Sequence, residues 1–320
     1  MIILKFFIVV LILIKIYYVA KKRWCTSKVC LNGKTVLVTG ANTGIGYETA
    51  LEFAKRGARV ILACRDLKKA AEAKDKIISL TENKNVVVKE LNLASLKSVK
   101  KIALDIIENE ERLDILVNNA GVGAINNKMT EDGLQIQMQI NYFAPVLLTI
   151  YLVDLLRRTG NSRIINVSSC LAYFANVTAD TINKYGESPV KTYSNSKLGN
   201  IIFTRKLASL LKGSTVSVYS LHPGEIQTDI FRHFKGWHKF VLFIVKTSYF
   251  KTPEEGAQTT LYTALEQGLE KYSGHFFIEC QKRPFYKTAT DDSLNEEVWQ
   301  ATVKLLDCEK EVEKLFPKIS

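Results

Sequence analysis

Short apolar runs rich in β-branched residues alternate with longer helical patterns along most of the chain. The apolar runs predict strands over residues 35–39, 59–63, 86–90, 115–118, 163–168, 216–221 and 275–278. Between them, apolar positions recur every three or four residues, which predicts helices over residues 44–56, 67–80, 96–111, 134–159, 193–212 and 253–265. Several strands are apolar at nearly every position, as is typical of strands buried on both faces. The alternation predicts an α/β fold, a Rossmann-type doubly wound parallel sheet of about seven strands.

The first twenty residues depart from this pattern. They read MIILKFFIVVLILIKIYYVA and are followed at once by KKRW. A helix of that length spans about 30 Å, the thickness of the hydrocarbon core of a membrane. A cleaved signal peptide is the alternative, because the uncharged centre (residues 6–14) has the length of such a segment. The bulky residues before Ala20 argue against a cleavage site.

We therefore expect three parts: a membrane-anchor helix (residues 1–20), a basic linker (21–30) and one domain (31–320). The basic cluster after the apolar run places the domain on the cytosolic side by the positive-inside rule. The endoplasmic reticulum is the membrane that we expect, and the bilayer is then a partner of the protein.

Composition narrows the class of protein. The chain is 47% hydrophobic and 24% charged, which excludes a disordered or fibrous protein. Its net charge of +12 suits an anionic cofactor, an anionic membrane surface or nucleic acid. The basic residues form no long arm, so we expect no nucleic-acid binding. Six scattered cysteines and four histidines predict neither a disulfide framework nor a metal site, and no pattern indicates an oligomeric state.

A glycine-rich loop, TGANTGIG over residues 39–46, joins the first predicted strand to the first predicted helix. Glycines at such a position allow backbone N–H groups to approach a pyrophosphate at the N-terminus of the helix. The loop therefore predicts a dinucleotide site that includes Gly40, Asn42, Thr43, Gly44, Ile45 and Gly46.

The end of the second predicted strand bears on the choice of dinucleotide. An acidic residue there accepts hydrogen bonds from the ribose in NAD-binding folds, but this chain has Cys64 followed by Arg65. A guanidinium suits a 2′-phosphate, so we expect NADP(H) in preference to NAD(H). Asp66 either faces the ribose or caps the next helix.

Tyr193 and Lys197 are four residues apart in a predicted helix and therefore share one face. A free tyrosine has a pKa of about 10, and a nearby cation favours its phenolate form. The same spacing also suits an ordinary solvated pair. Polar residues that end other strands at the same edge of the sheet favour a site: NNAG (118–121), Ser168 with Ser169, and HPG (222–224).

Together these motifs resemble the short-chain dehydrogenase/reductase family over residues 34–228. Their order is TGxxxGIG, NNAG, SS, YxxxK and HPG. The stretches GANTGIGY, GARVILACRD and YSNSKLGN, with the apolar N-terminus, are similar to the membrane-anchored retinol dehydrogenase branch of that family.

The resemblance implies roles for four catalytic residues. Tyr193 exchanges a proton with the substrate oxygen, and Lys197 lowers the pKa of Tyr193 and holds the nicotinamide ribose. Ser169 hydrogen-bonds the reacting oxygen, while Ser168 faces the structure. Asn141 anchors a water that relays protons.

It also implies further contacts with the cofactor. Asn119 and Gly121 line its adenosine side, and Pro223, Gly224 and Thr228 contact its nicotinamide end. Asn92 and Leu93 stand where the family has Asp-Leu beside the adenine.

The expected function is an NADP(H)-dependent oxidoreductase that interconverts a lipophilic alcohol and its aldehyde or ketone, with retinol and retinal favoured. A hydroxysteroid or another lipid carbonyl is the alternative substrate, since CLAYF replaces the branch's His-rich stretch after the serines. A catalytically silent NADP-binding membrane scaffold is the alternative from another class. Residues 230–251, apolar with basic flanks, predict either a helix over the core or a lid that touches the membrane.

Overall fold

The computed structural model describes residues 22–123, 125, 127–224 and 250–317. The predicted anchor helix, Thr228 and nearly all of the predicted lid lie outside these residues.

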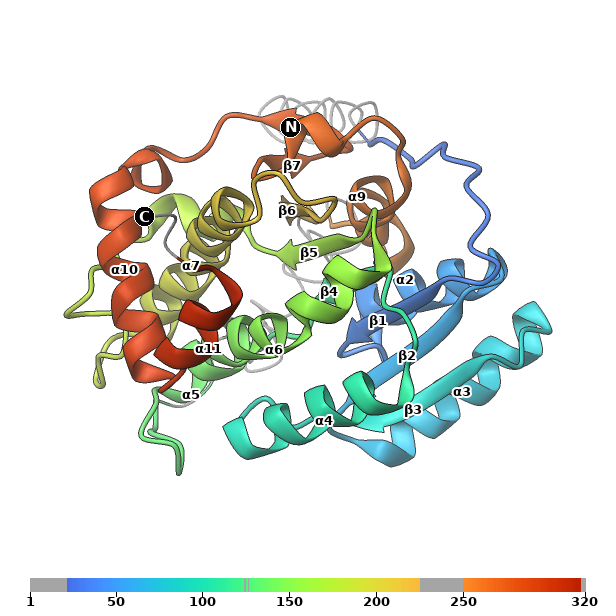
Figure 1. Cartoon of the computed structure of the whole chain (residues 1–320), viewed down its shortest axis with the longest axis horizontal. Helices are drawn as coiled ribbons and strands as arrows, with labels where there is room; N and C mark the ends of the chain where they lie inside the picture. Colours follow the sequence, from blue (N-terminus) through green and yellow to red (C-terminus); the bar gives the residue numbers. More distant parts are fainter. Residues whose placement is uncertain (1–21, 124, 126, 225–249, 318–320) are drawn as a thin grey trace, which may run out of the picture.

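The centre of the fold is one sheet whose strands run in the order β3-β2-β1-β4-β5-β6-β7-β8 (Figure 1). Neighbouring strands are parallel as far as β7, and β8 is antiparallel to β7. The doubly wound α/β fold is thus confirmed, but the sheet has eight strands rather than about seven. The eighth strand reads QKR and carries no apolar signal. The strands are β1 (Thr35–Thr39), β2 (Arg59–Cys64), β3 (Val86–Glu90), β4 (Ile115–Asn118), β5 (Arg163–Val167), β6 (Ser217–His222), β7 (Phe276–Ile278) and β8 (Gln281–Arg283).

Helices cover both faces of the sheet. On one face lie α2 (Gly44–Lys55), α3 (Leu67–Thr81) and α9 (Pro253–Leu265). On the other lie α4 (Leu96–Asn109), α6 (Ala144–Thr159) and α7 (Pro189–Leu210). Two helices that the sequence pattern did not predict, α10 (Asp292–Leu305) and α11 (Glu309–Leu315), pack against α7 and α6 (Figure 1). The short turns are α5 (Ile136–Met138), the π-helix η1 (Gln139–Phe143), and the 3₁₀ helices η2 (Cys170–Phe174), η4 (Glu270–Tyr272) and η5 (Lys287–Thr290).

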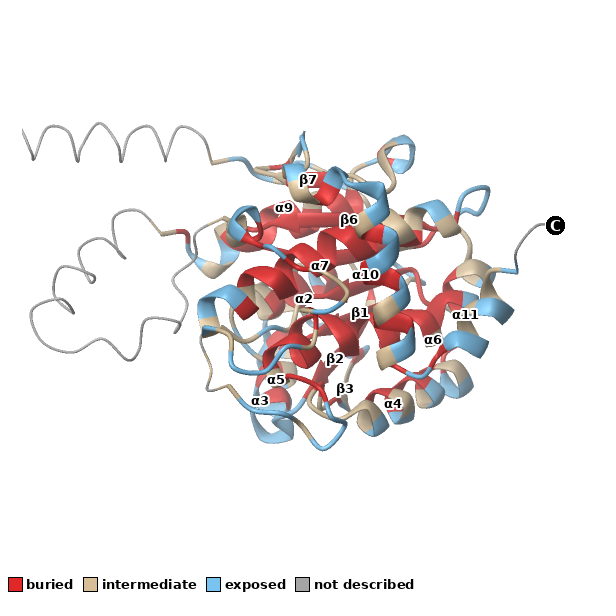
Figure 2. Cartoon of the chain, turned by 90° about the vertical axis from the view of Figure 1, so that its left-hand side faces the viewer, coloured by how far each residue is buried: buried red, intermediate tan, exposed pale blue. Residues whose placement is uncertain are grey.

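Successive residues of a strand point to opposite faces of the sheet and pack into two separate hydrophobic cores. Leu37 packs into the cluster beneath α4, α6 and α7, whereas Val36 and Val38 pack into the cluster beneath α2, α3 and α9. The central strands and the inner helix faces are accordingly buried, and the outer helix faces are exposed (Figure 2). Each fully buried aliphatic side chain contributes about 1.5–3 kcal/mol.

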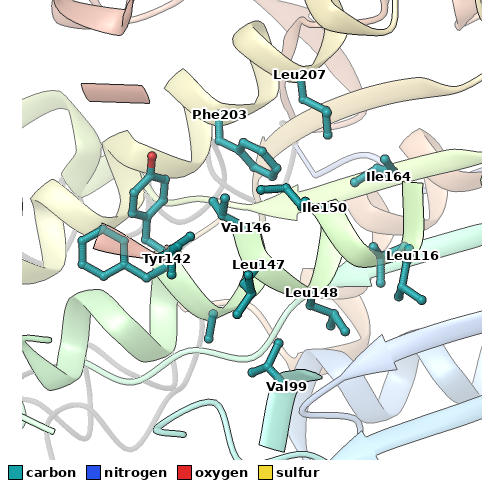
Figure 3. Packing of buried hydrophobic residues seen from close by; sticks show 14 of the residues in the cluster. Val99, Leu116, Tyr142, Val146, Leu147, Leu148, Ile150, Ile164, Phe203 and Leu207 are labelled. Atoms are coloured by element: carbon teal, nitrogen blue, oxygen red, sulfur yellow. The ribbon is translucent and has the colours of Figure 1, made fainter. Parts of the chain in front are cut away.

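Most residues of helix α6 are buried in the first core. Its residues Val146, Leu147, Leu148 and Ile150 are fully buried among strand and helix side chains (Figure 3). Among the described residues, Ile136–Thr159 is also the one helical stretch long and apolar enough to cross a membrane. Because 89% of its most apolar window is buried inside the protein, it is a core helix.

The helix predicted over residues 134–159 is not continuous. It begins as α5, widens into the π-turn η1 and continues as α6. The ring of Tyr142 occupies the space beside Gly199, where a Cβ would lie 2.8 Å from the Cδ2 atom of the ring. The π-turn places Asn141 toward the carboxyl edge of the sheet, consistent with the frequent occurrence of such turns at functional sites.

Helix α7 starts one turn earlier than predicted. Pro189 occupies its first turn, and the Ser188 hydroxyl accepts a hydrogen bond from the Lys191 N–H at 3.2 Å. The spacing of Tyr193 and Lys197 is unaffected, because both lie within the helix.

Candidate active site

The predicted site residues converge at the carboxyl ends of the central strands. β1, β4, β5 and β6 are neighbours in the sheet and parallel, so the segments that follow them meet at one edge. This edge carries the glycine-rich loop after β1, the NNAG segment after β4, the serine pair after β5 and Pro223 after β6.

Asn119 holds the glycine-rich loop against β4. Its side-chain amide donates to the Thr39 carbonyl at 2.9 Å, and its backbone N–H donates to the Thr39 hydroxyl at 3.0 Å. The chain is packed so tightly here that a Cβ on Gly46 would lie 2.4 Å from the Gly40 carbonyl oxygen. Asn119 and Gly46 therefore shape the loop from beneath.

The start of α2 has the features of an anion site. Thr43 is the N-cap residue, but its side chain makes no capping hydrogen bond. Gly44 has a φ of +60°, and a Cβ there would meet nothing within 4 Å, so the backbone is open on that side. N–H groups at the start of a helix attract a phosphate. The loop thus fits the pyrophosphate of a dinucleotide, as predicted.

Cys64, Arg65 and Asp66, at the end of β2 and just after it, differ in their contacts. The buried Cys64 thiol accepts hydrogen bonds from the backbone of Ala41 and Asn42, and burial raises its pKa to about 11. Asp66 caps α3, since its carboxylate accepts from the Lys69 N–H at 3.1 Å. Arg65 is exposed, and its guanidinium forms no ion pair with any described residue. Of the two alternatives for Asp66, the structure shows the helix cap.

The catalytic candidates meet between β5 and α7. The hydroxyl groups of Ser169 and Tyr193 are hydrogen-bonded. The Lys197 ammonium donates to the Val167 carbonyl at 3.0 Å and lies 5.6 Å from the centroid of the Tyr193 ring. Ser168 donates to the Lys197 carbonyl at 2.6 Å, which confirms that it faces the structure.

Burial dominates the electrostatics of this pair. It raises the pKa of Tyr193 above the ordinary value, and the hydrogen bond from Ser169 opposes this rise. Burial also lowers the pKa of Lys197 from 10.5 to about 8. The hydrogen bond from Ser169 thus favours the Tyr193 phenolate.

Asn141 lies beside Lys197 and is held rigidly. Its side-chain oxygen accepts from the Val122 N–H at 2.8 Å, and its amide donates to the Val122 carbonyl at 2.8 Å and to the Ser196 hydroxyl at 3.0 Å. A Cβ on Gly121 would lie 3.2 Å from the Lys197 ammonium and 3.4 Å from the Asn141 oxygen. Gly121 thus allows these two groups to come together over the NNAG segment.

The remaining predicted contacts are more dispersed. Asn92 accepts the Ala94 N–H at 3.1 Å in a turn before α4, and Leu93 beside it is buried. Pro223 and Gly224 follow β6, where Gly224 has a φ of +95°.

Sequence reasoning missed the polar network that supports the site. The Asn118 amide donates to Asn166 and Thr149, each at 2.9 Å, and the Asn166 amide donates to Thr204 at 2.9 Å. All four are buried, and the network ties β4 and β5 to α6 and α7. The signal was present as asparagines within otherwise apolar strands. Ser196 was also missed, although it lies within the YSNSK stretch.

Comparison with known proteins identifies the family. Residues 34–239 match the family model of the short chain dehydrogenases. The chain is 40% identical to retinol dehydrogenase 11 of Mus musculus over 309 residues, which cover 94% of this chain and 95% of that protein. It is 40% identical to retinol dehydrogenase 13 of Homo sapiens over 294 residues, 89% of this chain and 88% of that protein.

Solved structures agree with the fold. An uncharacterized protein from Mycobacterium paratuberculosis superposes with a TM-score of 0.71 at 28% identity, covering 88% of this chain and 96% of that one. A short chain dehydrogenase from Escherichia coli CFT073, complexed with NADPH, superposes with a TM-score of 0.62 at 25% identity, covering 78% and 97%. From the motifs, the site and these matches, the chain belongs to the short-chain dehydrogenase/reductase family and is a retinol dehydrogenase-like enzyme.

Proposed function

We propose that this enzyme is an NADP(H)-dependent oxidoreductase of a lipophilic alcohol and its aldehyde or ketone, with retinol and retinal as the favoured pair. The observation that carries the proposal is the hydrogen-bonded pair of Tyr193 and Ser169 beside the buried ammonium of Lys197. The family uses a nicotinamide cofactor, which supplies the hydride when bound.

The residues after β2 support NADP(H). Arg65 has an exposed guanidinium without an ion-pair partner among the described residues, and the carboxylate of Asp66 is engaged at the start of α3. A guanidinium suits a 2′-phosphate, because it can donate two hydrogen bonds to phosphate oxygens. The Asp66 carboxylate already accepts a hydrogen bond from the start of α3. The similar enzyme from Escherichia coli was solved with NADPH.

The surface next to Ser169 supports a lipophilic substrate. Tyr173 and Phe174 lie in η2, directly after Ser169, and are 63% and 73% exposed. Their rings are in edge contact at 5.2 Å, and Tyr173 also contacts Tyr286 at 5.7 Å. Exposed aromatic side chains in contact with one another form an apolar patch, and such patches are typical of ligand-binding grooves and other interaction sites. The retinol dehydrogenases at 40% identity favour a retinoid.

In this proposal each side chain has a defined task. Tyr193 gives its proton to the carbonyl oxygen in reduction and takes it from the alcohol in oxidation. Ser169 hydrogen-bonds the reacting oxygen, Lys197 holds the nicotinamide ribose, and Asn141 anchors a water that relays protons. Gly40, Gly44 and the first turn of α2 hold the pyrophosphate.

The proposal includes a membrane location. The apolar segment over residues 1–20 would anchor the chain in the endoplasmic reticulum membrane, with the domain in the cytosol. Such a location places the site close to substrates that dissolve in the bilayer.

The test is NADPH oxidation with a panel of retinal, a steroid ketone and a fatty aldehyde, using the full chain in detergent. Retinal should give the highest kcat/KM, and Tyr193→Phe should lower turnover by about 100-fold or more, since it removes the acid. Tyr185→Phe is the matched control, because Tyr185 is 61% exposed and outside the site. Unchanged turnover in Tyr193→Phe would refute the mechanism.

The panel also separates the two alternatives. A preference for the steroid ketone or the fatty aldehyde would assign another lipid carbonyl as substrate. Binding of NADPH without turnover of any carbonyl would favour the membrane scaffold.

A further inference from the structure

A second deeply buried lysine lies at the carboxyl edge of the sheet, apart from Lys197. The Lys251 ammonium pairs with the Glu279 carboxylate at 2.6 Å, and the two side chains are only 8% and 19% exposed. Burying both charges is costly, so such a pair contributes less to stability than to holding its neighbours in one arrangement.

The aliphatic stem of Lys251 covers Gly224. Gly224 has a φ of +95°, and a Cβ there would lie 2.7 Å from the Cδ atom and 2.9 Å from the Cε atom of Lys251. The lysine stem thus fills the space in which any other residue would place its side chain. This contact ties Lys251 to the segment that follows β6.

Both partners of the ion pair are fixed from other elements. Lys251 immediately precedes Thr252, which forms a capping box with Glu255 at the start of α9. Glu279 lies with Cys280 in the two-residue turn between β7 and β8, where their φ angles are +52° and +53°.

This turn is strained for residues other than glycine, and its contacts hold it in place. The Cys280 N–H donates to the Thr259 hydroxyl of α9 at 3.4 Å. The second oxygen of Glu279 accepts the Arg23 N–H at 3.4 Å. The pair therefore joins α9, the β7–β8 turn and the segment at residue 23 to the end of β6.

We propose that Lys251 and Glu279 are positioning residues for the nicotinamide end of the cofactor, acting through Pro223 and Gly224. Their ion pair holds the backbone after β6 in the conformation that receives the nicotinamide. The inference rests on the proposed function, which assigns Pro223 and Gly224 to that end of the dinucleotide.

The test compares two probes on the full chain in detergent: NADPH, and 2′-phospho-ADP-ribose, which lacks the nicotinamide. Lys251→Met keeps most of the stem over Gly224 but removes the charge. It should weaken NADPH binding about tenfold while the affinity for 2′-phospho-ADP-ribose changes by less than about twofold. The KM for NADPH should rise with it. Lys206→Met is the matched control, because it breaks the Lys206–Glu296 pair (2.5 Å) between α7 and α10.

Several outcomes overturn the inference. An equal loss for both probes means that the pair supports the whole domain, and no loss for either means that it positions nothing. If Lys251→Met folds poorly, Glu279→Gln provides the same comparison with the ammonium still hydrogen-bonded. Wild-type protein that binds NADPH but reduces no carbonyl contradicts the proposed function alone, whereas protein that binds neither NADPH nor NADH contradicts both.

Discussion

Lys197 is a buried lysine, in an environment where a charge costs free energy. It is only 4% exposed, and its ammonium donates to one backbone carbonyl, that of Val167, at 3.0 Å. Burial lowers its pKa to about 8, so the ammonium form costs the fold free energy at neutral pH. A group held at such a cost is typical of a functional site.

This cost predicts how stability depends on pH. The pKa of Lys197 falls from 10.5 in the unfolded chain to about 8 in the folded one, so the unfolded chain binds more protons between these values. Wild-type stability should therefore rise with pH in this window relative to Lys197→Met, which has no such proton. Urea unfolding of both proteins at pH 7, 8, 9 and 10 measures the difference. Parallel curves would show that the ammonium is not buried as described.

Arg65 should decide between the two dinucleotides. Arg65→Gln removes the guanidinium but keeps hydrogen-bonding capacity, so kcat/KM with NADPH should fall about tenfold or more while that with NADH stays within about twofold. Lys68→Gln, an exposed neighbour in α3, is the control for loss of one positive charge. Equal losses with both cofactors would remove Arg65 from the 2′-phosphate site.

An irregular segment, the π-turn η1, positions one of the catalytic candidates. The π-turn η1 carries Asn141. The side chain of Asn141 accepts a hydrogen bond from the Val122 N–H and donates one to the Val122 carbonyl, each at 2.8 Å. Tyr142 belongs to the same π-turn. Its ring packs against Gly199 of α7, and its hydroxyl is 2.9 Å from the Thr302 hydroxyl. The contact between Tyr142 and Gly199 therefore sets the distance between η1 and α7, the elements that carry Asn141 and Lys197.

Gly199→Ala tests this contact. The added Cβ would meet the Tyr142 ring at 2.8 Å, so the variant should lose about 1–3 kcal/mol of stability. Turnover should fall further than stability, because Asn141 moves with the ring. Turnover of the folded fraction and urea unfolding measure the two effects. Adding Tyr142→Leu should restore part of the turnover; a double variant no better than Gly199→Ala would show that the ring is not the obstacle.

The molecule as a whole joins its N-terminal segment to the far edge of the sheet. Residues 22–30 have no regular secondary structure, but they contact α9. The Lys22 ammonium pairs with the Glu255 carboxylate at 2.6 Å, and the Cys25 N–H donates to the Gln258 side chain at 3.1 Å. The predicted linker is therefore attached to the domain rather than free.

Removal of residues 1–20 should release the protein from membranes without unfolding it, because the contacts of residues 22–30 remain. The full chain should sediment with membranes and resist extraction by 1 M salt (about a 3 Å Debye length), whereas the shortened chain should stay in the supernatant and still bind NADPH. A shortened chain that still sediments would place membrane attachment elsewhere.

The sequence by itself determined the fold class, most elements and the chemistry of the site. Apolar periodicity is a local property, so it located β1 to β7 and the principal helices to within a few residues. The motifs likewise name Tyr193, Lys197 and Ser169, because that chemistry requires particular side chains in a particular order. The short strand β8 escaped this reasoning because it is polar and has no buried residue, and none of the residues of α11 is buried either. Helix α10 also escaped it, although it packs against α7.

Only the tertiary structure decided how these residues act on one another. The local sequence does not show that Asp66 caps α3 or that Arg65 forms no ion pair with a described residue. It also does not show that the Lys197 ammonium donates to the Val167 carbonyl, or that Ser169 hydrogen-bonds Tyr193. The local sequence also does not show the buried asparagine network, in which Asn118 and Asn166 are 48 residues apart. Nor does it show that the Lys251 stem covers Gly224, a residue 27 positions earlier in the chain. Burial and distance set pKa values and hydrogen bonds, and both arise only when separate segments of the chain pack together.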